Sequence, residues 1–492
     1  MSQPLRARVQ VAGVVGGFGL LVAALLVLQL AQRAPQSAVA IGVVVLAVGA
    51  WLALLGLTWP PVAIGVLLVA LFVWPAVPAD ALPISPAMLA WAGVLATSTI
   101  AVLRRRSPTP LFGAVELAMA CFVLWNVASA LLPHPYPTGT EDDQDFSVWR
   151  FILTSAVLPF SLYVIGGFAV DRRHNKIILW PILGIVGYSA LVSVLQFTGP
   201  TELVWPRYII DDPRWVGRAV GVLHTPVANG FLLIVGFVIG VQLGGQRTLK
   251  RWERAVAFGI AAATVPAIYL THTRAVWLAF AITLVLGVVL AGRTRILYLI
   301  TLVLVVVAVV IDWSNFLGAD RSTGGVGSTR EIYDRLNGIA TSLWAIEHWP
   351  IAGSGLGTFT QLNTVDHQQW SDSTPWIQGF GISSHENELG IAAELGLVGL
   401  ALWLAVLLLL VRRLARAVRL ASADAAEDPG LTLIALNGLV VWLIIGTTVD
   451  LRFLDLPSGL VMLLAGIAVG QCERTHGPAP GPAVERPLVA MR

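Results

Sequence analysis

A few residues in the second half of the chain have the side chains needed to transfer a group to a hydroxyl. His385 is followed by Glu386 and, two residues later, by Glu388. A histidine beside carboxylates can act as a general base near neutral pH. Arg274 opens an apolar run, and Arg330 opens an amphipathic one. Guanidinium groups bind phosphate-like anions through two parallel hydrogen bonds, so these arginines could hold a charged leaving group.

Each of these residues also has an interpretation without chemistry. An arginine at the end of a membrane helix often extends to the lipid headgroups, which is the alternative for Arg274. Arg330 could pair with Glu331 or Asp334, and His385 could be a loop residue with no role. Taken singly, the residues leave these alternatives open.

Other polar positions are weaker candidates for substrate binding. Three alternate glycines follow Pro350, a pattern that suits either a tight turn or a close approach of the backbone to a ligand. The candidate substrate-binding residues are Gly355, Gly357, Glu386, Asn387, His272 and His224. No spacing of His, Cys, Asp or Glu resembles a metal site, and no cofactor is predicted.

The composition places these residues in a membrane protein. Of 492 residues, 57% are hydrophobic and only 12% are charged, and the mean hydropathy is +0.79. A soluble domain has about 25% charged residues, so the chain is predicted to cross a lipid bilayer many times. The net charge of +3 is small, which argues against a nucleic-acid partner.

The predicted fold is all-α: a polytopic integral membrane helical bundle of about 12–14 transmembrane helices with a large extracytoplasmic loop that contains an amphipathic helix. The predicted spans are 9–30, 38–57, 61–75, 86–103, 111–132, 149–170, 177–198, 225–244, 253–271, 273–291, 295–312, 394–411, 430–449 and 456–471. The predicted regions are a transmembrane bundle at 1–312, a catalytic loop at 313–393, C-terminal transmembrane helices at 394–471 and a disordered cytoplasmic tail at 472–492.

The loop should contain one surface helix. Ser328 and Glu331 have the spacing of a capping box, and Ile332, Leu336 and Ile339 begin an apolar face that repeats every three or four residues. This helix could lie along the membrane surface or pack on the bundle.

The orientation follows from the Arg and Lys residues of the loops. Both termini are predicted to be cytoplasmic, because this placement puts most of the Arg and Lys residues inside. Arg274, Arg330, His385, His224 and Arg452 then all lie on the outer side. Nucleotides are absent there, so any donor must be an already activated, lipid-linked molecule.

Together these stretches resemble the O-antigen ligase/O-antigen polymerase family of bacterial envelope glycosyltransferases. The resemblance covers about residues 271–399 and follows the order of the motifs. These are Arg274 with Trp277 and Leu278, then Arg330, then Trp349-Pro350-Ile351-Ala352-Gly353-Ser354-Gly355-Leu356-Gly357, then His385 with Leu389, Glu394 and Gly396. The residue after this histidine is often Asn in the family, whereas here it is Glu386, with Asn387 one position later.

The resemblance implies a multi-pass protein of the bacterial cytoplasmic membrane that transfers a glycan from undecaprenyl pyrophosphate to an acceptor hydroxyl. Transfer would be metal-independent and inverting, with Arg274 and Arg330 on the pyrophosphate and His385 as the base. Three acceptors stay open: lipid A core, another glycan, or a protein Ser or Thr, as in a protein O-oligosaccharyltransferase.

Two other classes of function compete with this one. A polysaccharide or lipid transporter or flippase predicts ionisable residues at mid-membrane depth and broken helices in related halves of the chain. Glu116 is an isolated acid in the fifth predicted span, and no matching residue is found in the other half, so this class is the weaker one. A receptor or assembly scaffold would only bind through the outer loop. Of the three classes, only an enzyme would release the pyrophosphate lipid.

Overall fold

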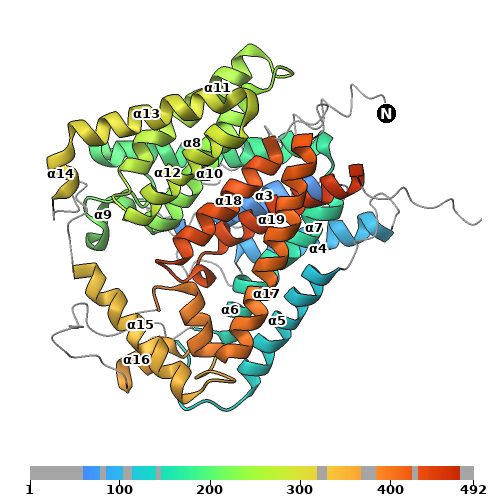
Figure 1. Ribbon diagram of the computed structural model, residues 1–492, viewed down its shortest axis with the longest axis vertical. Helices are drawn as coiled ribbons and strands as arrows, with labels where there is room; N and C mark the ends of the chain where they lie inside the picture. The colour runs from blue at the N-terminus through green and yellow to red at the C-terminus, as the bar shows by residue number, and fades with distance from the viewer. Residues whose placement is uncertain are drawn as a thin grey trace, which may run out of the picture.

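The molecule is a bundle of helices, most of them long and apolar (Figure 1). The structure is a computed structural model that describes residues 59–77, 85–103, 113–139, 146–318, 330–366, 384–423 and 430–476. Within these ranges there is no strand. The helices of the bundle are α3 (Pro60–Val73), α4 (Pro86–Leu103), α5 (Ala114–Leu131), α6 (Val148–Ile152), α7 (Leu158–Ala169), α8 (Asn175–Thr198), α10 (Pro226–Gly245), α11 (Arg251–Tyr269), α12 (Arg274–Leu290), α13 (Arg295–Ile311), α17 (Asn387–Ala423), α18 (Gly430–Gly446) and α19 (Asp455–His476).

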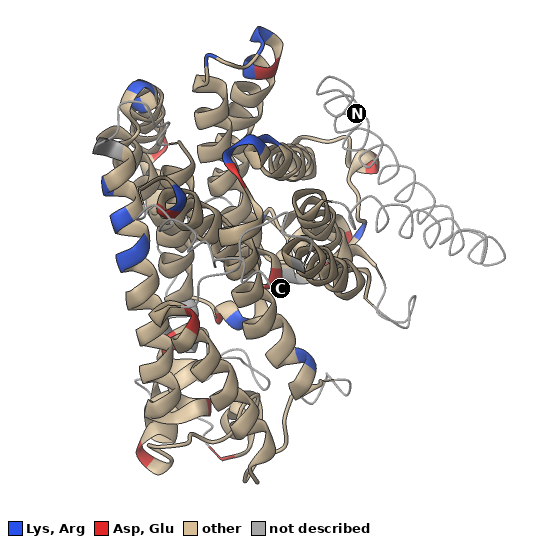
Figure 2. Cartoon of the chain, turned by 90° about the vertical axis from the view of Figure 1, so that its right-hand side faces the viewer, with Lys and Arg blue, Asp and Glu red and all other residues tan. Residues whose placement is uncertain are grey.

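These helices confirm the predicted all-α membrane fold. Among the described residues, seven helices are long and apolar enough to span a membrane, and four shorter apolar helices accompany them. Figure 2 shows long stretches of helix that carry neither basic nor acidic residues. The predicted spans from 61–75 onward each correspond to one helix or to consecutive helical segments. The predicted spans 9–30 and 38–57 and most of the predicted tail lie outside the described residues.

Two helices form the centre of the bundle. In both α10 and α19, 94% of the most apolar 18-residue window is buried inside the protein. These two helices therefore contact other helices almost all round. Close packing makes this possible in α19, because Gly466 and Gly470 lie directly against the backbone of Tyr163 and Gly167 on α7. Small residues at such spacing let membrane helices approach closely and gain dispersion contacts.

Short elements join the bundle helices on the face that carries the predicted site residues. They are α9 (Tyr208–Asp211), α14 (Trp313–Leu317), α15 (Arg330–His348), α16 (Phe359–Val365) and the 3-10 turn η10 (Leu451–Phe453). In Figure 1, α15 and α16 lie together at one end of the molecule, and α15 packs on α17.

The amphipathic helix α15 packs on the bundle through its small and polar face. Asn337, Thr341 and Ser342 are fully buried, whereas Leu336 and Leu343 are 38% and 56% exposed. The predicted capping residue Ser328 lies outside the described residues.

The helix α17 is broken at Gly396. This residue has φ 68° and ψ −176°, a conformation that essentially only glycine adopts. The break separates a short N-terminal segment that follows His385 from a long apolar segment. It differs from the predicted single span 394–411, because helical residues begin at Asn387.

Candidate functional site

The glycine-rich segment and the break in α17 are built against each other. The Ser354 amide donates to Ala393 O (2.9 Å), and the Leu397 amide donates to Pro350 O (2.8 Å). A Cβ atom at Gly396 would lie 2.1 Å from Ile351 O. The two segments can therefore approach this closely only because residue 396 has no side chain. This pairing fixes the segment that starts with His385 relative to the glycine-rich segment.

Glu394 adds two hydrogen bonds to the junction between the glycine-rich segment and the break in α17. Its Oε1 accepts a hydrogen bond from the Phe359 amide (3.1 Å) at the start of α16, and its Oε2 accepts one from Arg452 Nη1 (2.6 Å). The sequence placed Glu394 in a family motif without a role. Its place in the structure is to join α16, α17 and η10.

Arg218 lies beside the start of α12 because two loops are bonded together. The Ala219 amide donates to Leu270 O (2.8 Å), and His272 Nδ1 lies 2.6 Å from Gly217 O. Arg218 Nη2 then donates to Thr273 Oγ1 (2.9 Å), the residue just before Arg274. The sequence analysis did not select Arg218, which no local motif marks.

Arg335 connects this arginine pair to His385. Burial lowers the pKa of Arg335, and the charge of Arg274 lowers it further, while Glu386 opposes the change. Burial, together with the charge of Arg335, lowers the pKa of Arg218 to about 10. Arg335 is therefore close enough to Arg218 and to Arg274 for their positive charges to act on it, and arginine side chains stay charged at neutral pH.

His385 belongs to the same group of charges. Burial lowers the pKa of its imidazole, Arg335 lowers it further, and Asp450 opposes both. A histidine with a lowered pKa is neutral at pH 7 and can accept a proton. Beside it, burial and the neighbouring Glu388 raise the pKa of Glu386, while Arg335 opposes this shift.

Arg274 and His385, two of the three predicted catalytic residues, thus both lie within electrostatic reach of Arg335. Arg330 is the first residue of α15, and its side chain lies outside the described residues. Asn387 accepts a hydrogen bond from the Leu451 amide (3.2 Å) and donates to Glu388 (3.2 Å). It thus anchors the start of α17.

The remaining candidates have packing contacts in the structure. A Cβ atom at Gly355 or Gly357 would meet the ring of His134 or of Phe146, respectively. His224 stacks on Tyr208 with ring centroids 3.7 Å apart. The ring of His272 lies near those of Phe197, Tyr269 and Trp277. These positions keep their substrate-binding role as a prediction.

Three histidines share an unusual backbone conformation. Among the residues that the structure describes, the only non-glycine residues with positive φ are His224 (63°), His272 (44°) and His385 (53°). Each stands two residues before the first residue of α10, α12 or α17. Such conformations are uncommon outside glycine and often occur at functional sites.

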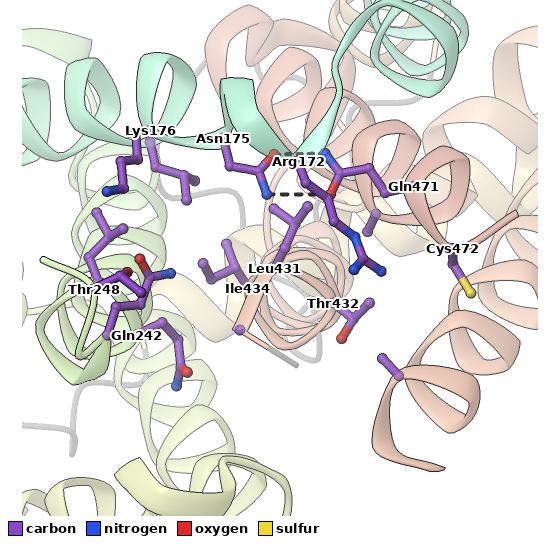
Figure 3. A pocket seen from close by; sticks show the side chains of 16 residues that line it. Arg172, Asn175, Lys176, Gln242, Thr248, Leu431, Thr432, Ile434, Gln471 and Cys472 are labelled. Carbon is purple, nitrogen blue, oxygen red and sulfur yellow. Dashed lines mark hydrogen bonds between the residues drawn. The ribbon is translucent and has the colours of Figure 1, made fainter. Parts of the chain in front are cut away.

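A cavity of about 330 Å3, lined by both apolar and polar side chains, lies at the opposite ends of the same helices. Figure 3 shows Asn175 and Gln471 bonded to each other at its wall, with Arg172 and Lys176 nearby. None of the predicted site residues lines it. In the described part of the chain, no group of three or more His, Cys, Asp or Glu could hold a metal ion.

Comparison with known proteins agrees with the motifs. No curated protein matches the chain. Residues 257–404 match the family described as O-antigen ligase, and this stretch contains Arg274, Arg335, the glycine-rich segment, His385 and Glu394 but neither Arg218 nor Arg452. The match confirms that this multi-pass membrane protein resembles the O-antigen ligase/O-antigen polymerase family, as the order of its motifs predicted.

Proposed function

We propose that this protein is a membrane glycosyltransferase that moves a glycan from an undecaprenyl-pyrophosphate donor to an acceptor hydroxyl. The reaction would take place on the outer face of the cytoplasmic membrane. The observation that carries the proposal is the group of Arg218, Arg274 and Arg335 next to the neutral base His385.

Arg335 is repelled by both Arg218 and Arg274, and Glu386 offsets this only in part, so an anion bound between the guanidinium groups would be stabilised. A diphosphate supplies that anion, and its negative charge grows as the bond to the sugar breaks. Fixed cations stabilise this charge in the transition state, and removing one such donor costs about 10²–10³-fold in rate. The arginines would thus do work that a metal ion does in other phosphate sites.

His385 provides the second half of the reaction. The acceptor hydroxyl passes its proton to the imidazole while its oxygen attacks the anomeric carbon. The bond from that carbon to the pyrophosphate breaks, and its electron pair leaves with the lipid pyrophosphate. Attack from the side opposite the leaving group inverts the anomeric configuration.

We assign binding of the pyrophosphate to the guanidinium groups of Arg274 and Arg335, with Arg218 near Arg335. The role of Arg330 stays a prediction. The acceptor follows the O-antigen ligase/polymerase type, either lipid A core or a growing glycan, and transfer to a protein hydroxyl is the alternative within the family.

The test uses purified protein in lipid nanodiscs with an undecaprenyl-pyrophosphate-linked glycan. Lipid A core oligosaccharide, the glycan repeat and a Ser/Thr peptide are offered separately as acceptors. The proposal expects released undecaprenyl pyrophosphate and one elongated product of inverted configuration, and it expects Arg335→Ala and His385→Ala to lose both.

The matched control is Arg173→Ala. Its side chain is 78% exposed and pairs loosely with Asp171 (3.5 Å) on the opposite face, so this variant should keep the wild-type rate. Binding of the lipid-linked glycan without any release of pyrophosphate lipid would instead support a transporter or a receptor.

A further inference from the structure

A buried cluster of three ions lies outside the arginine group. Arg452 Nη2 donates to Asp450 Oδ2 (2.6 Å), and Arg452 Nη1 donates to Glu394 Oε2 (2.6 Å). The three side chains are only 6%, 2% and 5% exposed. Two carboxylates face one guanidinium, so the cluster has one negative charge in excess.

An excess charge in so buried a place is costly. Desolvating a carboxylate costs several kcal/mol, and one guanidinium cannot compensate two of them fully. Burial lowers the pKa of Arg452, but Asp450 and Glu394 more than reverse this and raise it, so the arginine stays charged. The excess negative charge would therefore favour a positive charge that forms nearby.

The cluster lies directly behind the segment that carries His385. A Cβ atom at Gly390 would meet both Ser384 Oγ (2.3 Å) and Arg452 Nη2 (3.1 Å). On the other side, the Leu451 amide, next to Asp450, is bonded to Asn387 Oδ1 (3.2 Å). Asn387, two residues after His385, is thus bonded to the turn that carries the cluster, and Gly390 of the same segment lies between Ser384 and Arg452.

Charged groups from two other elements act on His385: Arg335 of α15 and Asp450 of the turn after α18. Its own segment also carries Glu386 and Glu388. Arg335 lowers the pKa of His385, and Asp450 opposes that change. An imidazole that takes up a proton next to Arg335 becomes a second cation there, and only a negative group can offset the repulsion.

We propose that Asp450 is a positioning residue for His385, and that the Arg452–Glu394 pair holds it in place. This inference rests on the proposed function. As the acceptor proton reaches His385, the excess negative charge of the cluster stabilises the imidazolium that forms, while the arginines stabilise the departing pyrophosphate. The negative cluster thus stabilises the positive charge on His385, and the arginine group stabilises the negative charge on the pyrophosphate, in the same step.

A purely structural role for the cluster predicts something different. It would tie α17 to η10 and would affect how much protein folds, but not the pH at which His385 takes up a proton. The pH dependence of the rate separates the two roles.

The experiment compares wild-type protein with Asp450→Asn, which has the same shape without the charge. The proposal expects the rate of pyrophosphate-lipid release to fall by about tenfold or more. It also expects the acidic limb of the pH–rate profile to move to lower pH, because the neutral side chain no longer favours the imidazolium. Asp450→Glu, which keeps the charge, should restore the position of that limb.

Glu116→Gln is the matched control. Glu116 is 7% exposed and accepts from Arg413 at the same 2.6 Å, but on the opposite face. It should leave the acidic limb in place. An unmoved limb in Asp450→Asn would overturn the proposal. If that variant does not fold, Glu394→Gln removes the same excess charge and must move the limb in the same direction.

A direct titration keeps the inference separate from the activity. The NMR signal of the His385 ring is assigned by its absence in His385→Gln, and it is titrated in wild-type and Asp450→Asn protein. A lower pKa in Asp450→Asn supports the role of Asp450 even if no glycan is transferred, which would refute only the proposed function. An unchanged pKa refutes the role of Asp450 whether or not transfer occurs.

Discussion

Replacing Arg452 by methionine should destabilise the protein more than replacing an exposed arginine of the same face. The change removes the guanidinium that Asp450 and Glu394 share and leaves two carboxylates that are 2% and 5% exposed. Breaking a buried ion pair by removing one partner costs about 3–5 kcal/mol. Arg207→Met is the control, since Arg207 and Asp211 form an exposed pair at 3.4 Å that contributes about 0.5 kcal/mol.

The assay is thermal unfolding followed by tryptophan fluorescence in nanodiscs. Arg452→Met should melt clearly below wild type and Arg207→Met close to it. The triple variant Arg452→Met, Asp450→Asn, Glu394→Gln leaves no buried charge and should recover much of the loss. If Arg452→Met melts with Arg207→Met, or if the triple variant melts lower still, the argument from uncompensated buried charge is refuted.

Three further predictions concern the junction, the base and the arginine group. Gly396→Ala should destabilise the protein in the same melting assay, because its Cβ would lie 2.1 Å from a carbonyl oxygen at a positive φ, whereas Gly259→Ala in α11 has open space and should not. The rate of pyrophosphate-lipid release should rise with pH through the lowered pKa of His385 and should be level by neutral pH, because the unprotonated imidazole is the base. Arg335→Ala should lower that rate by about 10²–10³-fold, and Arg335→Lys should recover only part of it, because lysine keeps the charge without the two-pronged geometry.

Each of these expectations has a contrary result. Equal melting of the two alanine variants would remove the steric argument at the broken helix. A rate that falls between pH 6 and 7 would mean that the protonated imidazole is the active form. An Arg335→Ala protein with the wild-type rate would mean that α15 supplies no side chain that the reaction needs.

The sequence selected Arg330 of α15, which stays a prediction because its side chain lies outside the described residues, and it did not select Arg335, which acts on His385 from the same helix. It favoured Arg330, because a helix start offers free backbone amides to an anion. The structure brings Arg335 to the site, because α15 turns its small polar face toward the bundle. Asn363 Nδ2 donates to Thr341 Oγ1 (2.7 Å) on that face. Amphipathic pattern alone assigns the packed face to the apolar residues, so it could not show this orientation.

Arg218 could not be predicted from the sequence for a different reason. Its position depends on hydrogen bonds between two loops more than fifty residues apart, such as that from Arg218 to Thr273. No periodicity or spacing encodes such a contact. His385 and Arg274, in contrast, stand in short motifs at predicted helix starts, and local pattern was enough to select them.

The glycine-rich segment is linked to the distant residue His385 through buried contacts. This link does not require the segment to touch the substrate. Its backbone lies against the break at Gly396 closely enough that side chains there would collide. That contact lets the carboxylate of Glu394 reach both α16 and Arg452, and Arg452 in turn holds Asp450 behind His385. A shift of the segment would therefore be passed to the base through a chain of buried hydrogen bonds. Under the proposed function, the glycines and the histidine would act on the same reaction because they share one rigid junction, with or without a shared ligand.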